Sequence, residues 1–291
     1  MYIRDMLSQR LTFSCELFPP KKGADLPEIF RVVGDTAAIN PDFISVTCGA
    51  AMSTSANTVA VARHVESTGV TALAHLTCVS LSRRDVPAML ETLQGGGVGN
   101  ILALRGDLPE GQKAPLGDMP NASHLMEEIS RFGGFSVGGA CYPEGHVECQ
   151  SPERDIENLK KKVDAGCDFL TSQMFFDNNV LYRFLYRMHS KGITLPVIAG
   201  IMPVTNKKQI GRIIELSGTY LPPRFKNILD RFGDDGRAMQ QAGIAYAAEQ
   251  IIDLIANGVR GVHIYTMNRP EVARSIAGSL SHILRHEKSG N

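Results

Sequence analysis

The stretch "FSVGGACYPEGHVECQSPERDIENLKKKVDAGCDFLTSQMFF", Phe135–Phe176, contains the strand, helix and strand pattern that decides the fold. Apolar, β-rich runs open and close the stretch, and a segment with helical periodicity lies between them. Ser151 is a predicted N-cap, Pro152 occupies the first helical position, and Gly166 ends the helix. Two strands joined in this way form a parallel pair with a crossover helix.

The same unit recurs along the whole chain. Successive strand runs start about 30 residues apart, except for the last, which is what a strand, a crossover helix and two loops require. Eight units predict one (β/α)₈ TIM barrel over residues 1–291, with extra helices between strands seven and eight, at about 205–260. The runs are LTFSCELF from Leu11, DFISVTCG from Asp42, TALAHLTC from Thr71, NILALRGD from Asn100, FSVGGACY from Phe135, FLTSQMFF from Phe169, PVIAGIMP from Pro196 and GVHIYTMN from Gly261.

The charge pattern excludes several classes of partner. Thirty basic and thirty acidic residues cancel, and the longest block of like charge is Lys160–Lys162. This balance argues against a protein that binds nucleic acid or a membrane surface. No apolar run approaches the length of a membrane span, and the N-terminus "MYIRDMLSQR" lacks the apolar core of a secretory signal. We therefore expect a cytoplasmic protein.

The six cysteines contain no C-x-x-C pair, and most lie within apolar runs. They are interpreted as reduced, buried thiols. The pair His75 and Cys78 near a strand end keeps metal ligation open as a minority interpretation, but the spacing yields no tetrahedral ligand set, so no metal is predicted.

Polar side chains occur late in most of the predicted strands. In (β/α)₈ enzymes the active site lies at the C-terminal ends of the strands, so these residues should meet at one mouth of the barrel. Each buried polar group that lacks a partner destabilises the fold, so such convergence suggests function. The residues are Glu16, Thr47, His75, Arg105, Asp107, Tyr142, Glu144, Gln173, Tyr265, Asn268 and Arg269.

Structural interpretations remain open for most of these residues. Asp107 could be a turn residue, as could Thr47 or Tyr142, and His75 is as readily a hydrogen-bonded core histidine as a binding group. The lysines of Lys160–Lys162 could form a solvated helix face. Glu16 is harder to explain structurally, because its neighbours in the run are apolar and ionised glutamates are rarely buried without partners.

Several motifs in register along nearly the whole chain closely resemble the methylenetetrahydrofolate reductase family. Singly, several of them are weak signals, whereas together they are highly specific. They are CELFPPK at Cys15–Lys21, SVTCGA at Ser45–Ala50, AHLTC at Ala74–Cys78, LALRGDLP at Leu102–Pro109, YPEGH at Tyr142–His146, LKKKVDAGCDFLTSQMFFD at Leu159–Asp177, GIMPVTN at Gly200–Asn206 and HIYTMNR at His263–Arg269.

This resemblance implies a barrel that binds FAD at its mouth and reduces 5,10-methylenetetrahydrofolate to 5-methyltetrahydrofolate. By position, it implies that Glu16 is the general acid, that Asp107 lies beside flavin and pterin, and that Gln173 contacts folate. Gln209 and Arg269 match positions associated with nicotinamide or folate binding. The residues implied to hold FAD are Thr47, His75, Arg105, Gly106, Asp107, Tyr142, His146, Asp155, Asn158, Lys161 and Lys162.

The implied reaction gives Glu16 a physical role. The methylene carbon bridges two nitrogens in a five-membered ring, which must open to an iminium before it accepts the hydride that the reduced flavin delivers. Opening requires a proton on the leaving nitrogen, and a carboxylic acid can supply it near neutral pH where burial disfavours its charged form. The apolar neighbours of Glu16 match this requirement. Lys161 and Lys162 could offset the charge of the FAD pyrophosphate.

Two positions depart from the family pattern. Ile213 stands where well-known members carry an aromatic residue that stacks on the nicotinamide dinucleotide, and Asn121 stands where a tyrosine follows the fourth strand. The electron donor could therefore be NADH or NADPH, or a partner subunit, a ferredoxin or a flavodoxin-like carrier. We also expect a homo-oligomer without the C-terminal regulatory domain of larger eukaryotic relatives.

Two other functions remain as alternatives at this level. One is a pterin-binding methyltransferase barrel that passes a methyl group to a corrinoid partner and needs no flavin. The other is a partner-dependent subunit that binds folate and assembles with an electron-transfer protein.

Overall fold

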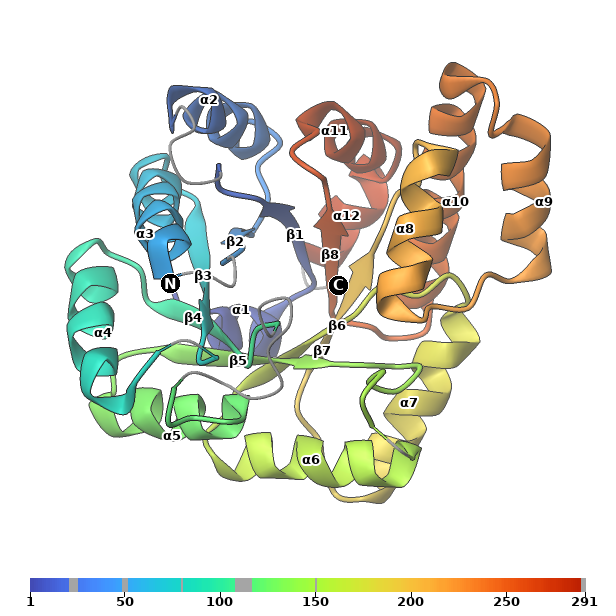
Figure 1. The fold of residues 1–291 in the computed structure, drawn as a ribbon. Helices are drawn as coiled ribbons and strands as arrows, with labels where there is room; N and C mark the ends of the chain where they lie inside the picture. The colour runs from blue at the N-terminus through green and yellow to red at the C-terminus, as the bar shows by residue number, and fades with distance from the viewer. Residues whose placement is uncertain (21–25, 49–51, 80, 108–116, 150, 289–291) are drawn as a thin grey trace.

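The chain forms a closed barrel of parallel strands, as predicted (Figure 1). The computed structural model describes residues 1–20, 26–48, 52–79, 81–107, 117–149 and 151–288, without the side chains of 52–55, 209, 212, 215, 216 and 288. Within these residues, each of eight strands pairs with the next, and the last pairs with the first. The strands are β1 (Thr12–Leu17), β2 (Phe43–Val46), β3 (Thr71–Thr77), β4 (Asn100–Leu104), β5 (Ser136–Cys141), β6 (Phe169–Ser172), β7 (Val197–Ile201) and β8 (Gly261–Tyr265).

Helices surround the strands on the outside of the barrel (Figure 1). Those in the described ranges are α1 (Ile3–Gln9), α2 (Leu26–Ala37), α3 (Met52–Ser67), the short 3-10 helix η1 (Arg83–Asp85), α4 (Val86–Gly95), α5 (Ala122–Phe132), α6 (Pro152–Asp164), α7 (Asn178–Ser190), α8 (Lys207–Ser217), α9 (Pro223–Phe232), α10 (Gly236–Ala256), α11 (Pro270–Ser279) and α12 (Ser281–Lys288).

The predicted ends of α6 are confirmed. The Ser151 side chain accepts a hydrogen bond from the backbone N–H of Arg154, and Pro152 begins the helix. After the helix, Gly166 has a φ of 97°, a conformation that favours glycine. These local signals fix where α6 lies, and its basic residues therefore lie beside the loop that follows β5.

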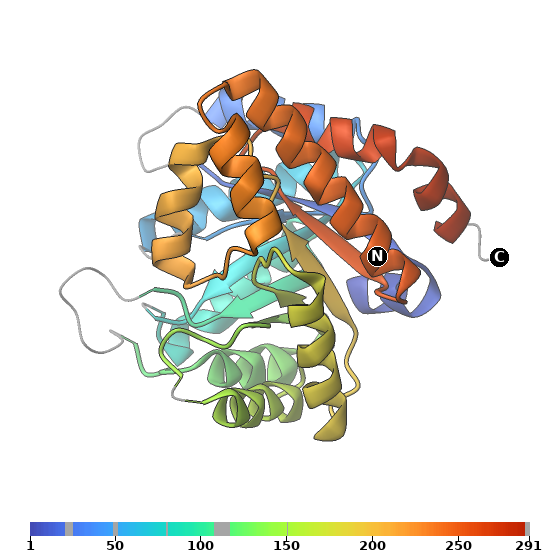
Figure 2. The same ribbon diagram turned by 90° about the vertical axis from the view of Figure 1, so that its right-hand side faces the viewer.

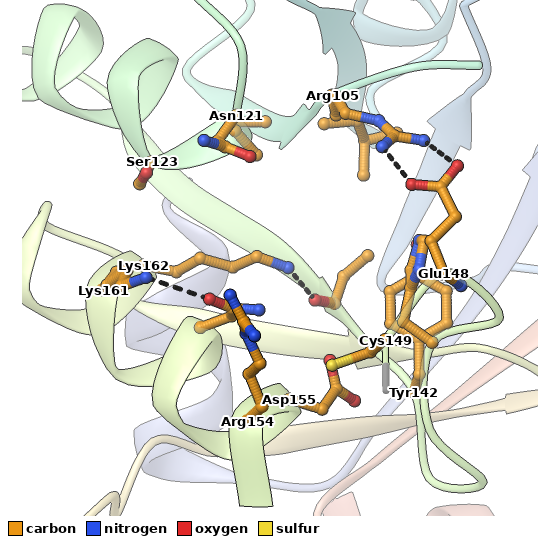
Figure 3. Close-up of a pocket in the computed structure, with 16 residues that line it drawn as sticks. Arg105, Asn121, Ser123, Tyr142, Glu148, Cys149, Arg154, Asp155, Lys161 and Lys162 are labelled. Carbon is orange, nitrogen blue, oxygen red and sulfur yellow. Dashed lines mark hydrogen bonds and ion pairs between the residues drawn. The ribbon is translucent and has the colours of Figure 1, made fainter. Parts of the chain in front are cut away.

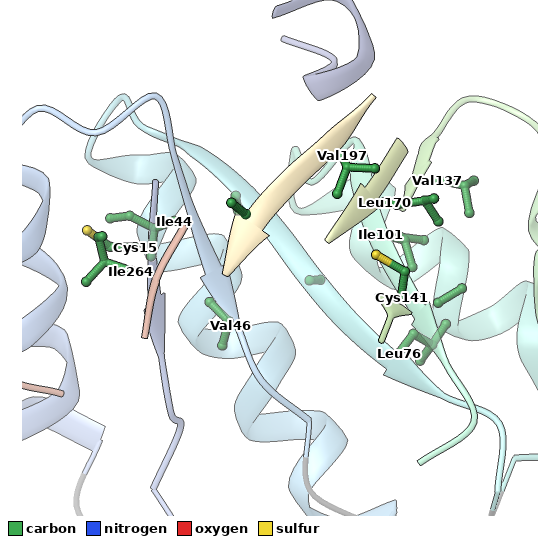
Figure 4. Packing of buried hydrophobic residues seen from close by; sticks show 14 of the residues in the cluster. Cys15, Ile44, Val46, Leu76, Ile101, Val137, Cys141, Leu170, Val197 and Ile264 are labelled. Atoms are coloured by element: carbon green, nitrogen blue, oxygen red, sulfur yellow. The ribbon is translucent and has the colours of Figure 1, made fainter. Parts of the chain in front are cut away.

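Alternate residues of each strand face opposite sides of the barrel wall. The outward-facing residues pack against the helices in one large apolar cluster, which includes Ile44, Ile101, Val137, Leu170 and Ile264 (Figure 4). The inward-facing residues fill the barrel itself. They are large and apolar near the start of the strands and become polar toward the strand ends. This change along the barrel axis leaves the polar groups at the C-terminal mouth.

The helix α1 closes the opposite end of the barrel, a feature that the sequence interpretation did not include. Its Ile3, Met6 and Leu7 are buried in the same cluster as Phe43 and Phe169 from inside the barrel. Burying side chains of this size contributes about 1.5 to 3 kcal/mol each. With this end plugged, the C-terminal mouth is where the barrel interior opens to a ligand.

The sixth strand is shorter than the predicted run. It ends at Ser172, and Phe175 and Phe176 leave the sheet. Two hydrogen bonds from side chains of α10 fix these residues outside the sheet. Gln250 Nε2 donates to the Phe175 carbonyl at 3.2 Å, and the Tyr246 hydroxyl donates to the Phe176 carbonyl at 2.5 Å. Tertiary contacts with α10 therefore override the β-propensity of these phenylalanines.

The predicted extra helices between the last two strands are α8, α9 and α10, which lie side by side in Figure 2. They share an apolar cluster in which Phe176 stacks on Phe225 at 4.8 Å between ring centroids. At Gly243 of α10, an added Cβ would lie 1.8 Å from the Val204 carbonyl oxygen, so only glycine allows this approach. The cluster carries Ile213 of α8 over the barrel mouth.

Four of the six cysteines are buried in the described part of the chain. Cys15, Cys78, Cys141 and Cys167 are buried thiols outside any disulfide, as predicted. Burial raises the pKa of the Cys15 thiol to about 12, so it stays protonated. Across the described ranges, no helix combines the length and the apolar character that crossing a bilayer requires.

Candidate active site

Two adjoining cavities open at the C-terminal mouth, each of about 370 Å³. Leu104, Ala140 and Tyr142 line both, so the cavities meet along β4 and β5. We call the first the polar cavity; its remaining lining is Ala103, Arg105, Asn121, Ala122, Ser123, His146, Glu148, Cys149, Arg154, Asp155, Asn158, Lys161 and Lys162. We call the second the central cavity; its remaining lining is Glu16, Phe18, His75, Leu102, Thr171, Ser172, Gln173, Met174, Met202, Ile213, Tyr265 and Met267.

Glu16 lies in the central cavity between two histidines. Its side chain is buried, and Oε2 is 3.7 Å from His75 Nε2 and 3.8 Å from His263 Nε2. Burial lowers the pKa of His75 to about 4; the nearby Glu16 opposes this shift and His263 adds to it. His75 is therefore neutral at neutral pH, and no full positive charge on it stabilises a Glu16 carboxylate.

His263 is a residue of this site that the strand-end criterion missed. Ser14 Oγ donates to the Val262 carbonyl at 3.1 Å and lies 2.7 Å from His263 Nδ1, so Nδ1 is assigned as the protonated nitrogen. On the other side of the ring, Nε2 lies 3.1 Å from Ser45 Oγ, within hydrogen-bond distance. His263 precedes the end of β8 by two residues, so it lies one inward-facing position deeper than Tyr265. Strand alternation is the signal that could have identified it.

Tyr265 covers another side of Glu16. Its hydroxyl donates to the Ser172 carbonyl at 2.8 Å. Burial raises the pKa of Tyr265 well above its usual range, and Glu16 adds to the rise. The phenol therefore remains protonated, so neither Tyr265 nor His75 places a charge beside Glu16 at neutral pH.

The rest of the central cavity is mostly apolar. Gln173 accepts a hydrogen bond at Oε1 from the Met174 backbone N–H at 2.9 Å, which leaves Nε2 as its donor group for a ligand. Met202 and Ile213 line the same cavity. Such a lining suits one face of a flat ring system with a few oriented polar groups.

The polar cavity is basic along α6 (Figure 3). Lys162 Nζ donates to the Ala140 carbonyl at 2.7 Å, and Lys161 Nζ donates to Asn158 Oδ1 at 3.0 Å. Burial lowers the pKa of the Lys162 ammonium, and the nearby Cys141, Cys167 and Asp155 oppose the shift. Arg154 lines the same wall. These cations favour an anionic group in the cavity.

The opposite wall of the polar cavity carries one ion pair and one aromatic pair. Arg105 binds both carboxylate oxygens of Glu148, at 2.5 and 2.9 Å. The rings of Tyr142 and His146 meet edge to face at 4.5 Å. Burial raises the pKa of Tyr142 to about 12, which keeps its hydroxyl protonated, and the charge of Asp107 adds to the rise.

Ten of the fifteen residues that the family resemblance assigned to the site line the two cavities, as does Tyr265 from the strand-end residues. Glu16, His75 and Gln173 lie in the central cavity, and Tyr142 lies in both. The others line the polar cavity: Arg105, His146, Asp155, Asn158, Lys161 and Lys162.

Four further predicted residues are described but lie outside both linings. The Thr47 carbonyl accepts from Thr58 Oγ1 at 2.9 Å, and Asp107 is exposed after β4. Arg269 donates to Thr205 Oγ1 at 2.6 Å and to Glu271 at 2.8 Å. The fourth is Gly106.

Gly106 has a φ of 85°, and an added Cβ would lie 3.0 Å from both Thr77 and Val79. The predicted Gln209 side chain is outside the part of the chain that the structure describes.

Several lining residues were not among the predicted site residues. Arg154 and Asn158 lie four positions apart on α6, so helical spacing could have identified Arg154. Asn121 and Ser123 enter from the start of α5, and Glu148 and Cys149 from the loop after β5. A search for polar residues at the C-terminal ends of strands does not find these positions, because they lie on helices and loops. Tertiary packing brings them to the mouth of the barrel.

Comparisons with known proteins identify one family. The family model described as methylenetetrahydrofolate reductase matches residues 2–281. The chain is 32% identical to the 5,10-methylenetetrahydrofolate reductase of Pectobacterium carotovorum, covering 94% of this chain and 91% of that protein. It is also 32% identical to methylenetetrahydrofolate reductase (NADH) 1 of Zea mays, with 93% of this chain matching 48% of the plant protein.

A solved structure is similar in fold. It is an uncharacterized protein from Clostridium thermocellum that binds two copies of 5-methyl-5,6,7,8-tetrahydrofolic acid. Its TM-score is 0.63 at 14% identity, covering 96% of this chain and 98% of that chain. At this identity the likeness supports the barrel fold alone.

Proposed function

Because this chain belongs to the methylenetetrahydrofolate reductase family, we propose that it reduces 5,10-methylenetetrahydrofolate to 5-methyltetrahydrofolate with FAD as its cofactor. The family makes the chain an oxidoreductase that acts on methylenetetrahydrofolate. The cofactor and the roles of single residues are our proposals. These proposals rest mainly on one observation: Glu16 lies in a mostly apolar cavity that adjoins a basic cavity.

The polar cavity fits the phosphates of a dinucleotide. Lys161, Lys162 and Arg154 line it from one helix, and the buried ammonium of Lys162 gains most from an anion. His75 lines the adjoining central cavity, and Thr47 and Gly106 are assigned to the same cofactor on the family resemblance alone. These groups would hold FAD, and when bound FAD supplies the hydride.

Glu16 would act as the general acid. Its side chain is buried in the central cavity, where Oε2 lies 3.7 Å from His75 Nε2, and His75 and Tyr265 are both uncharged at neutral pH. A carboxyl group at this position can reach a substrate nitrogen bound in the cavity and pass a proton to it. The paired histidines also restrict where the carboxyl group can point.

Other residues would hold the folate. Gln173 lines the central cavity with Nε2 left to donate to folate, and Asp107 lies near Tyr142, which lines both cavities. We propose Gln209 and Arg269 as further contacts for folate or nicotinamide. Arg269 is anchored by Thr205, so its guanidinium is already oriented near the mouth.

Two kinds of electron donor are proposed, a nicotinamide dinucleotide and a small electron-transfer protein. The name of the maize relative includes NADH, which favours a nicotinamide donor here too. Against this, Ile213 offers an aliphatic surface in the central cavity, where a stacked nicotinamide would gain from an aromatic ring. A ferredoxin or flavodoxin-like protein is the alternative donor.

An anaerobic absorbance titration tests the proposal. Purified protein reconstituted with FAD is first reduced by NADH or, separately, by dithionite, and then mixed with methylenetetrahydrofolate. A flavin bleached by NADH and reoxidised by the folate supports the full reaction. A flavin that only dithionite reduces, but that the folate reoxidises, supports a protein donor. A protein that binds no FAD contradicts the proposal and favours a flavin-free pterin methyltransferase.

A further inference from the structure

Thr171 occupies an unexpected position for a hydroxyl group. It lies on the inward-facing side of β6, between Phe169 toward the plugged end and Gln173 toward the mouth. Its side chain is 7% exposed and lines the central cavity together with Glu16 and His75. A threonine here therefore contributes to the wall against which a ligand of this cavity would pack.

The Thr171 hydroxyl has no hydrogen-bond partner among the described residues, and its oxygen is buried. The hydroxyl of the adjacent Ser172 accepts a hydrogen bond from the Gly200 backbone N–H at 2.9 Å. The two neighbouring hydroxyl groups thus differ: one is satisfied within the protein, and the other is left beside a cavity. Valine would fill the volume of Thr171 without an unpaired polar group.

A second buried polar atom in the same cavity shares this property. His75 Nε2 also has no hydrogen-bond partner within the described ranges, and Glu16 Oε2 lies 3.7 Å from it. His75 comes from β3, Thr171 from β6 and Gln173 from the residue after β6, and all three line one cavity. Buried polar groups are normally paired, so their arrangement suits a ligand with polar atoms along its edge.

We propose that the Thr171 hydroxyl hydrogen-bonds to a ring nitrogen or carbonyl at the edge of the planar heterocycle bound in the central cavity, and so orients it. Flavin and pterin both present such edges. The hydroxyl can donate to either kind of atom, and rotation about Cα–Cβ brings it toward the ligand. This inference rests on the proposed function and adds a ligand-positioning residue to it.

The test compares Thr171→Val, which removes the hydroxyl at nearly constant volume, with Thr171→Ser, which retains it. For each protein we would measure the FAD dissociation constant, the absorbance spectrum of the bound flavin, KM and kcat for methylenetetrahydrofolate, and the unfolding midpoint. Loss of one neutral hydrogen bond predicts a weakening of about 3- to 10-fold in Thr171→Val, with Thr171→Ser close to wild type.

The affected quantity identifies the ligand. A weaker FAD affinity and a shifted flavin spectrum in Thr171→Val indicate a contact with flavin. A higher KM with unchanged flavin binding indicates a contact with the pterin. If Thr171→Val matches wild type in all of these, or if Thr171→Ser is as impaired as Thr171→Val, the proposal is wrong. A wild-type protein that binds neither FAD nor folate would instead defeat the proposed function.

Discussion

Glu16 on β1 and His75 on β3 approach to 3.7 Å, between Oε2 and Nε2, although β2 separates their strands. Curvature of the barrel wall brings these side chains together at the mouth. Burial keeps His75 neutral there, so the two side chains do not form an ion pair at neutral pH. Both residues of this pair can be tested by substitution.

The Glu16→Gln variant should bind FAD and accept electrons like the wild type but reduce folate at least about 100-fold more slowly. Glutamine preserves the shape of the side chain and removes the transferable proton. Stopped-flow absorbance would follow flavin reduction and its reoxidation by methylenetetrahydrofolate separately. Reoxidation at the wild-type rate would remove Glu16 from the proton-transfer step.

The stability of the protein should fall as the pH drops from about 6.5 toward 4. The pKa of His75 is lowered to about 4, so in this window the unfolded chain binds a proton that the folded chain excludes. The difference amounts to at most about 3 kcal/mol from this group. Urea unfolding at several pH values, in one cofactor state, would measure it.

The control for this pH effect is a variant series. His75→Gln should show a flatter pH dependence between pH 6.5 and 4 than the wild type, whereas His189→Gln, at an exposed position, should follow the wild-type curve. Equal slopes for wild type and His75→Gln would rule out His75 as the source.

The Gly106→Ala variant should lose both stability and FAD affinity. A φ of 85° disfavours any side chain, by about 1 to 3 kcal/mol, and the new Cβ would press on Thr77 and Val79 at 3.0 Å. Gly192→Ala is the matched control, since Gly192 has a φ of 74° but open space around its Cβ position. Thermal unfolding and flavin content per chain would be compared. Equal losses in the two variants would show that only backbone strain matters.

The Lys162→Met variant should weaken FAD binding by about 10- to 100-fold, as expected for a lost charged hydrogen bond. Methionine keeps much of the buried aliphatic volume, so folding should be retained. Lys160→Met is the control, because Lys160 is exposed and pairs with Asp164 on the same helix. Fluorescence quenching of FAD on binding would give both affinities. An effect of similar size in Lys160→Met would indicate a general charge effect in place of a local contact.

Much of the barrel was predictable from local patterns. Short β-rich apolar runs and the turn residues after them identified all eight strands, and Ser151, Pro152 and Gly166 marked both ends of α6. These signals are short-range, because strand propensity, turns and helix caps depend on the conformation of a few consecutive residues. The end of β6 was wrong, since contacts of Phe175 and Phe176 with α10 ended the strand.

The residues of the site also divide into those that the sequence predicted and those that only the tertiary structure brought together. The chain order alone placed Glu16 late in an apolar strand, and parallel strands direct their C-terminal ends to one mouth. Closure of the barrel was needed to bring β8 beside β1, which places His263 3.8 Å from Glu16. Packing of α5 and α6 likewise separated the polar residues into two cavities. The amino-acid sequence by itself therefore determined the elements and the level of each polar group along its strand. The tertiary structure decided which of these groups face one another, because those distances depend on register and curvature summed around the whole barrel.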